Sequence, residues 1–391
     1  MATNTFVLDN GGCYAKAGLS TEKTKLIPNC IMKAKSERRR PFVGNQIDEC
    51  RDASGLFYIL PFQKGYLINW DVQKTVWDYI FSKECCPVNL NQTSVIFTEP
   101  PFNFPSNQEA LEEIFFEEFD CHSLLRINAV SLSCYNYKQK YPNSKCCIVV
   151  DCGYSFTHIV PYVNDTKMKE GIRRIDVGGK LLTNHLKEIL SYRQLHVMDE
   201  TYVINQVKED SCFISQDFYK DMEIAKLKGS TNTIVKDYVL PDFTSLRRGF
   251  LQDPSVESEQ QTLRLGNERF SIPEILFHPS DVGIRQMGIP EAIIDCLKAC
   301  EEEAWPHLLS NIILTGGSAK FPGFQERIFK EVRSLAPIEY PVNVMLAEDP
   351  MTYAWEGGKL LSKDPTFSSF LVTREEYDEE GHNICFERFD T

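Results

Sequence analysis

Residues 6–12 read Phe6-Val7-Leu8-Asp9-Asn10-Gly11-Gly12, and Lys16 follows shortly after them. The apolar run predicts a buried strand that ends on the carboxylate of Asp9 and turns back as a hairpin. The consecutive glycines leave backbone N–H groups open to a phosphate, and Lys16 would add a positive charge beside it. Because Asp-Asn-Gly is also an ordinary hairpin turn, this stretch alone leaves a purely structural role open.

The same pattern recurs further along the chain. Residues 147–153, Cys-Ile-Val-Val-Asp-Cys-Gly, again place an apolar strand ahead of an aspartate and a glycine, and residues 156–160 continue as another strand. The two aspartates, Asp9 and Asp151, are 142 positions apart (151 − 9). Internal repetition of this kind predicts two similar half-molecules that face one ligand.

Composition narrows the class of protein. A chain of 391 residues with 42% hydrophobic content suits two soluble domains. It has no long apolar run and no charged leader, so we expect neither a membrane span nor a secretory signal. Its 14 cysteines include no Cys-x-x-Cys, which favours buried, reduced thiols. A net charge of −13 argues against a primary DNA-binding protein.

One local segment departs from this acidic balance. Lys33, Lys35, Arg38, Arg39 and Arg40 form a basic cluster near the start of the chain. Such a cluster is often only a solvated face, and direct contact of Lys33–Arg40 with DNA stays open.

Strands alternate with helices along the chain, which predicts an α/β fold. A helix is expected over residues 72–81, a buried strand over 95–100, and another helix over 124–137 with Asn128 as its polar exception. Another apolar strand, residues 312–315, ends in Gly316 and Gly317.

Taken together, these motifs resemble the actin family, and the resemblance covers essentially the whole chain. The matching pieces are Leu8-Asp9-Asn10-Gly11, Asn69-Trp70-Asp71, Thr98-Glu99-Pro100, the run from Val150-Asp151 to Pro161, Leu240-Pro241-Asp242, Gly266-Asn267-Glu268-Arg269-Phe270, Leu314-Thr315-Gly316-Gly317, Phe321-Pro322-Gly323 and Trp355-Glu356-Gly357-Gly358. A single piece would be weak, but all of them occur in the family's order.

The resemblance implies the α/β actin-like ATPase fold, in which two ribonuclease-H-like domains surround a nucleotide cleft, as in hexokinase and the heat-shock chaperones. Residues 1–141, completed by 353–391, would form the first domain. Residues 142–352 would form the second, with an insertion at about 243–261. The implied cofactor is ATP or ADP with Mg²⁺.

The resemblance also implies roles for individual residues. Asp9 and Asp151 would hold Mg²⁺ through its waters. The residues that would meet the nucleotide are Asp9, Gly11, Gly12, Lys16, Asp151 and Gly153 at the phosphates, Lys208 and Glu209 at the ribose and base, and Gly316, Gly317 and Phe321 on the opposite wall. His158 matches the histidine near the attacking water.

Departures from the family's pattern fall on the groups that position this water. Gly12 replaces a serine that reaches the γ-phosphate, and Asn128 replaces a glutamine that orients the water. Tyr154 replaces an acid, and Met351 replaces a lysine beside the adenine. Because orienting a nucleophile can supply about 7 kcal/mol or more, we expect slow or absent hydrolysis. Asn128 and His158 remain as residual catalytic candidates, and the chain is not expected to act as an enzyme.

The contacts that build actin filaments are altered as well. The segment over residues 28–43 is shorter than in actin and carries the basic cluster, and Asp281 replaces an aromatic residue of the interstrand plug. The chain is therefore not expected to polymerise by itself. The sequence at residues 57–66, 153–158 and 191–200 is similar to a nuclear branch of actin-related proteins.

That branch implies a subunit of a chromatin-remodelling complex that exchanges a variant histone into nucleosomes. The expected partners are the remodeller ATPase complex and a zinc-finger HIT-type subunit, with histones or nucleosomes contacted indirectly. The expected location is the nucleus, with some protein in the cytoplasm. A cytoskeletal actin-like protein, or a slow ATPase or sugar kinase on the same fold, are the alternatives.

The insertion over residues 243–261 has two interpretations. It is either a surface loop that drifted in length or a partner site. In the second case Leu246, Phe250 and Leu251 would anchor a partner subunit, with Arg247 and Arg248 at the rim.

Overall fold

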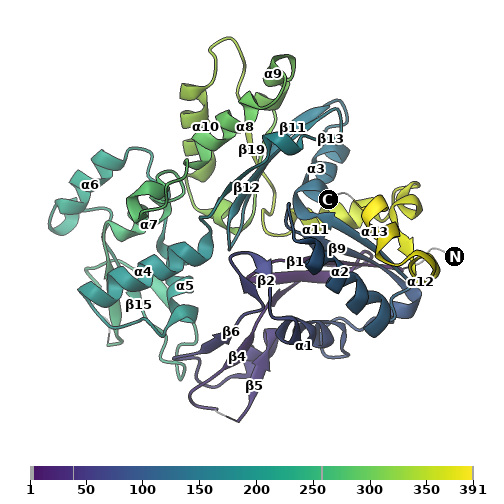
Figure 1. The fold of residues 1–391 in the computed structure, drawn as a ribbon. Coiled ribbons are helices and arrows are strands. Elements are labelled where there is room, and N and C mark those ends of the chain that lie inside the picture. Colours follow the sequence, from purple (N-terminus) through teal and green to yellow (C-terminus); the bar gives the residue numbers. More distant parts are fainter. Residues whose placement is uncertain (1–3, 38, 257–258, 390–391) are drawn as a thin grey trace.

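A computed structural model describes residues 4–37, 39–256 and 259–389. Arg38 of the basic cluster and residues 257–258 of the insertion lie outside the described residues. The chain forms two α/β units side by side (Figure 1). We call them the first and the second domain.

A six-stranded sheet is the centre of the first domain. Its strands are β20 (Val372–Thr373), β10 (Ser123–Asn128), β9 (Thr93–Glu99), β1 (Asn4–Asn10), β2 (Tyr14–Leu19) and β3 (Lys25–Pro28), in this spatial order. β1, β9 and β10 run parallel, so their carboxyl ends meet at one edge. β1 and β2 form the predicted hairpin, in which Asp9 pairs with Lys16.

A second sheet repeats this plan in the second domain. Its strands are β13 (Thr166–Lys167), β12 (Thr157–Val163), β11 (Cys146–Cys152), β18 (Ile312–Thr315) and β19 (Val344–Leu346), and β14 (Arg173–Ile175) pairs with β12. In this register Asp151 lies opposite His158 on β12 and Thr315 on β18. The end of β11 therefore delivers Asp151 next to the glycines that follow β18.

Smaller sheets extend each domain. In the first domain β5 (Pro41–Val43), β4 (Ile31–Lys33) and β6 (Phe57–Ile59) form what we call the small sheet, and β7 (Phe62–Gln63) pairs with β8 (Tyr66–Leu67). In the second domain β16 (Phe250–Gln252), β15 (Lys236–Val239) and β17 (Thr262–Leu265) form the outer sheet. β16 belongs to the insertion, so this segment adds a strand to the edge of β15.

The helices cover the sheets. They are α1 (Trp70–Phe81), α2 (Pro105–Glu113), α3 (Ala129–Lys140), α4 (Gly179–Arg193), α5 (Thr201–Ser211), α6 (Phe218–Lys226), α7 (Glu268–Glu274), α8 (Ile289–Lys298), α9 (Trp305–Leu309), α10 (Phe324–Leu335), α11 (Tyr353–Leu361), α12 (Arg374–Glu380) and α13 (His382–Arg388). The side chain of Asn69 caps α1 by accepting from the backbone N–H of Val72.

The chain passes between the domains at α3 and α11, which pack against each other. Their approach is close because a Cβ at Gly357 would lie 2.1 Å from the carbonyl oxygen of Leu132. Only glycine permits this contact.

The helix predicted over residues 124–137 is wrong in its first part. Residues 123–128 form β10, and helix α3 begins at Ala129. β10 lies between β9 and β20 and is buried along most of its length, so its side chains do not alternate between apolar and polar. A short apolar run of this kind does not separate a strand from a buried helix. As a result, Asn128 lies at the end of a strand.

All fourteen cysteines are free thiols, and all but Cys13 are buried, which confirms the prediction of reduced cysteines. Within the part of the chain that the structure describes, no helix combines the length and apolarity needed to cross a bilayer.

Candidate functional site

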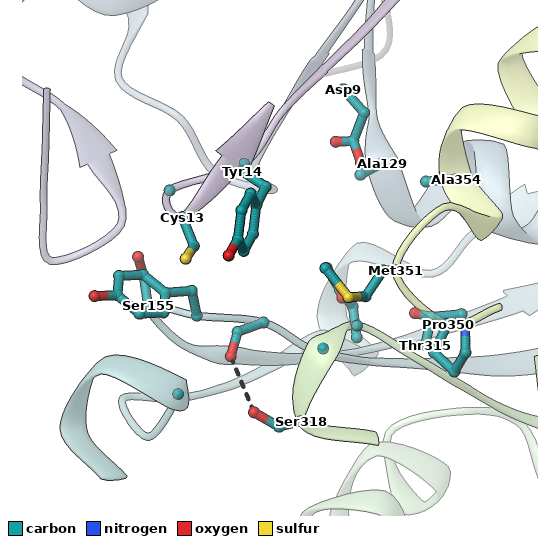
Figure 2. Close-up of a pocket in the computed structure, with 18 of the residues that line it drawn as sticks. Asp9, Cys13, Tyr14, Ala129, Ser155, Thr315, Ser318, Pro350, Met351 and Ala354 are labelled. Carbon is teal, nitrogen blue, oxygen red and sulfur yellow. Dashed lines mark hydrogen bonds between the residues drawn. The ribbon is translucent and has the colours of Figure 1, made fainter. Parts of the chain in front are cut away.

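A cavity of about 580 Å³ lies between the two domains. Asp9, Cys13 and Tyr14 line it from the first domain, and Ser155, Ser318 and Met351 face them from the second (Figure 2). The predicted site residues that line this cavity are Asp9, Gly11, Gly12, Lys16, Asp151, Gly153, His158, Lys208, Glu209, Gly316, Gly317 and Phe321. Asn128, the remaining predicted site residue, is not among the described residues that line the cavity.

The carboxylates predicted to hold a cation lie beside a lysine. Lys16 Nζ is 3.0 Å from Asp9 Oδ2, and Thr98 Oγ1 donates to Asp9 Oδ1 at 2.7 Å. Burial raises the pKa of Asp151 to about 6, against the opposing charge of Lys16. Burial lowers the pKa of Lys16, but the charge and hydrogen bond of Asp9 outweigh it and leave that pKa raised. This part of the wall therefore combines two carboxylates with the cation of Lys16.

A buried amide network fixes the hairpin that carries Asp9. The backbone N–H of Asn10 donates to Thr98 Oγ1 at 3.1 Å. The side-chain oxygen of Asn10 accepts from Asn29 Nδ2 at 3.1 Å and from Trp77 Nε1 at 3.3 Å. Gln73 completes the network through both asparagines. These bonds hold the turn in one conformation before any ligand binds.

Glycines keep the backbone bare at the charged end of the cavity. Gly316 has a φ of +86°, and a Cβ there would lie 2.7 Å from Asp151 Oδ1. A Cβ at Gly11 would lie 2.9 Å from Lys16 Nζ. Side chains at these positions would fill the space that phosphate oxygens and a hydrated cation need, so the residues present fit a magnesium-bound nucleotide.

A hydroxyl from the second domain stands beside the position where actin has a serine. A Cβ at Gly12 would lie 2.9 Å from Ser155 Oγ, so Ser155 takes the space of a side chain at residue 12. Tyr154 and Met351, the other departures from the family's pattern, also line the cavity. Burial raises the pKa of Tyr154, which keeps its phenol neutral.

His158 lies in the wall without a hydrogen-bond partner among the described residues, at either ring nitrogen. Burial, with help from the charge of Arg174, lowers its pKa from 6.5 to about 3. The ring is therefore neutral at pH 7. An unpaired buried nitrogen beside a cavity fits a water or ligand oxygen as its missing partner.

We expect this buried ring to make the nucleotide-free protein sensitive to acid. Between pH 6.5 and 3 the unfolded His158 takes up a proton that the folded protein excludes, so stability falls as the pH falls through this window. From pH 6.5 to pH 5 the loss is about 2 kcal/mol. Urea unfolding measures the free energy of unfolding at pH 6.5 and at pH 5. The difference between the two values should be smaller in His158→Leu than in the wild type.

The exposed His196 supplies the control for that experiment. His196→Leu should keep the pH dependence of the wild type. An unchanged pH dependence in His158→Leu would contradict the prediction.

Asn128 is held away from the cavity. Its Nδ2 donates to the carbonyl oxygen of Glu99 at 3.4 Å, and Lys167 Nζ of the second domain donates to its Oδ1 at 2.7 Å. The side chain is fully buried. In this arrangement the side chain of Asn128 is held by protein groups and does not line the cavity.

Helix α5 supplies the other end of the wall. Lys208 Nζ donates to Thr183 Oγ1 and Asn205 Oδ1, both at 2.9 Å, and burial lowers its pKa. Glu209 Oε1 accepts from Asn205 Nδ2 at 2.8 Å. Arg248 of the insertion also lines this wall, although no sequence motif predicted it. Its place in the cavity wall is known only from the folded structure.

Comparisons with known proteins show what the chain is similar to. A family model described as Actin matches residues 1–390. Actin-related protein 6 of Drosophila melanogaster is 51% identical, over 97% of this chain and 98% of that protein. Actin-like protein ARP6 of Yarrowia lipolytica is 39% identical, over 98% of this chain and 97% of that protein. Actin-related protein 6 of Arabidopsis thaliana is 37% identical, over 99% of both chains.

Proposed function

The chain belongs to the actin family, and from this premise we propose that it is a nucleotide-bound, non-catalytic scaffold in a nuclear chromatin-remodelling complex. The predicted actin-like α/β fold is confirmed. The chain is an actin-related protein of the same type as the relatives named actin-related protein 6. The observation that carries the proposal is a cavity lined by the groups predicted to bind a cation and phosphate, with Asn128 outside its wall.

ATP or ADP with Mg²⁺ fits this wall. Asp9 and Asp151 would accept hydrogen bonds from the waters of the metal, which neutralises phosphate charge when bound. Lys16 and the backbone at Gly11 and Gly153 would face the phosphates. Because these groups come from both domains, a bound nucleotide would join the domains and stabilise the closed arrangement.

Weak hydrolysis follows from the positions of the polar groups. Lys167 and the backbone of Glu99 hold Asn128, so of the two catalytic candidates only the neutral His158 is left to bind a water. Nucleotide extracted from denatured protein and measured by chromatography should be present in nearly equimolar amount. Phosphate release in multiple turnover should be negligible. Sustained release would favour the alternative, a slow ATPase, in which His158 binds the attacking water.

Membership of a remodelling complex is supported by the likeness to actin-related proteins 6 and by an exposed side chain in the insertion. Of its three expected anchors, Leu251 packs on the core of the second domain and Leu246 is half-buried. Phe250, at the start of edge strand β16, is 48% exposed. We therefore assign the contact with a zinc-finger HIT-type subunit to Phe250.

Capture of the tagged chain from nuclear extract, followed by mass spectrometry, tests this assignment. The remodeller ATPase and the zinc-finger subunit should be captured with the wild-type chain, and histones should be captured only together with these subunits. A minor pool of the tagged chain should be found in cytoplasmic extract. Phe250→Glu should lose the zinc-finger subunit, while Phe57→Glu, at another exposed phenylalanine, should retain it. Equal capture by both variants would contradict the assignment.

The pure protein should stay monomeric in salt and Mg²⁺ that polymerise actin. Asp281 lies exposed in a short 3₁₀ helix (Pro279–Val282) at the position of the actin plug. Burying an unpaired carboxylate in a filament contact costs several kcal/mol. Sedimentation should leave the protein in the supernatant, and regular filaments in electron micrographs would contradict the prediction.

A further inference from the structure

We propose that the first part of the insertion closes the nucleotide cavity from within the chain. The latch, as we call residues 242–248, ties the second domain to the small sheet of the first domain and places Arg248 against the nucleoside. This inference rests on the proposed function, because the ligand it retains is an adenine nucleotide.

The latch has a defined conformation. The Oδ1 atom of Asp242 accepts from the backbone N–H groups of Thr244, Ser245 and Leu246, each at 2.9 Å, and these bonds lower the pKa of Asp242. They hold Phe243 at a φ of +56°, which is rare for an aromatic residue. A strained residue fixed by this many bonds indicates a built feature, in contrast to a loop that only drifted in length.

Phe243 joins the two domains. Its side chain packs both against the core of the second domain and against the buried cluster under the small sheet. Tyr202 of α5 packs against the same two clusters. Arg247 adds a hydrogen bond from Nη1 to the carbonyl oxygen of Asp48, at 3.2 Å. Opening the cavity at this end would separate these contacts.

Other bonds lie along the same seam. Both carboxylate oxygens of Glu200 accept from the backbone N–H of Gly55 at 3.0 Å. Lys35 Nζ lies 3.4 Å from Asp199 Oδ2, but both side chains are exposed and such a pair contributes little. The seam therefore depends on the latch and on Glu200.

Arg248 extends the latch into the cavity. It forms part of the wall, and its Nη2 lies 2.7 Å from Asp210 Oδ1. The other oxygen of Asp210 accepts from the hydroxyl of Tyr238 at 2.9 Å, which fixes the carboxylate. Asp210 follows Glu209, at the end of the wall where a ribose and base are expected. A planar guanidinium there can stack on a base or donate to ribose oxygens.

Release of a fluorescent ATP analogue from the full chain, chased with unlabelled ATP, tests the latch. The variant Phe243→Gly removes the ring, and glycine accepts the φ of +56° without strain, so the turn should still fold. Combined with Arg247→Ala, it should speed release about tenfold. Phe250→Ala, in the same insertion but outside the latch, should release the analogue at the wild-type rate.

Arg248→Ala should weaken the binding of ATP and of ADP by the same factor, roughly fivefold, because the contact is with the part that both share. A loss confined to ATP would place Arg248 at the γ-phosphate and overturn its assignment. Wild-type release rates in Phe243→Gly/Arg247→Ala would overturn the latch. Wild-type protein that binds no nucleotide would instead refute the proposed function.

Discussion

Replacing Asp151 with asparagine should empty the cavity of nucleotide and remove the stability that the nucleotide provides. A ligand that binds only the folded state adds about 4 kcal/mol at a thousand times its Kd. Asparagine keeps the shape of the side chain but loses the charge that attracts a hydrated cation. In excess Mg-ATP, the melting temperature of Asp151→Asn should fall well below that of the wild type.

The nucleotide-free proteins provide the comparison. After the nucleotide is stripped with a chelator, Asp151→Asn should be at least as stable as the wild type, because burial raises the pKa of Asp151 to about 6 and the charged form is unfavourable there. Asp281→Asn, at an exposed carboxylate, should behave as the wild type in both states. If loaded and stripped wild-type protein melt at the same temperature, the nucleotide does not join the domains.

Replacing Arg126 with methionine should lower the free energy of unfolding by about 3–5 kcal/mol. The Arg126 side chain is 1% exposed and bonds to Glu99 at 2.5 Å and to Glu112 at 3.1 Å. Each glutamate side chain is 2% exposed. Without the guanidinium, two carboxylates stay buried without this cation. Urea unfolding at pH 7 measures the loss.

A triple variant shows whether the buried charge is the cause. Arg126→Met with Glu99→Gln and Glu112→Gln removes the cation and both anions, so most of the stability should return. If the triple variant is no more stable than Arg126→Met alone, packing of the arginine is the larger effect. Because Glu99 lines the cavity and its carbonyl oxygen holds Asn128, the single variant should also weaken nucleotide binding.

The sequence was most informative where function depends on neighbouring residues. A strand, an aspartate and a turn through glycines are adjacent in the chain, so the motif predicts the hairpin that carries Asp9 and Lys16. The repeat at Asp151 predicts that a second carboxylate faces the same ligand, and in the structure Asp9 and Asp151 line one cavity.

Features that depend on distant contacts could not be predicted in this way. The position of Asn128 is set by Lys167 of the other domain, and β10 is recognisable as a strand only beside β9 and β20. Arg248 reaches the cavity because the insertion folds back over α5. Its residue type gave no indication of this role.

The crossing of α3 and α11 gives the latch a mechanical advantage. Both passages of the chain between the domains are at these helices, whereas the small sheet that the latch contacts lies away from them, at the lower edge of the view (Figure 1). If the domains rotate about the crossing, a contact acts with a torque proportional to its distance from that axis. Weak bonds at the latch can therefore resist opening as effectively as much stronger bonds beside the pivot.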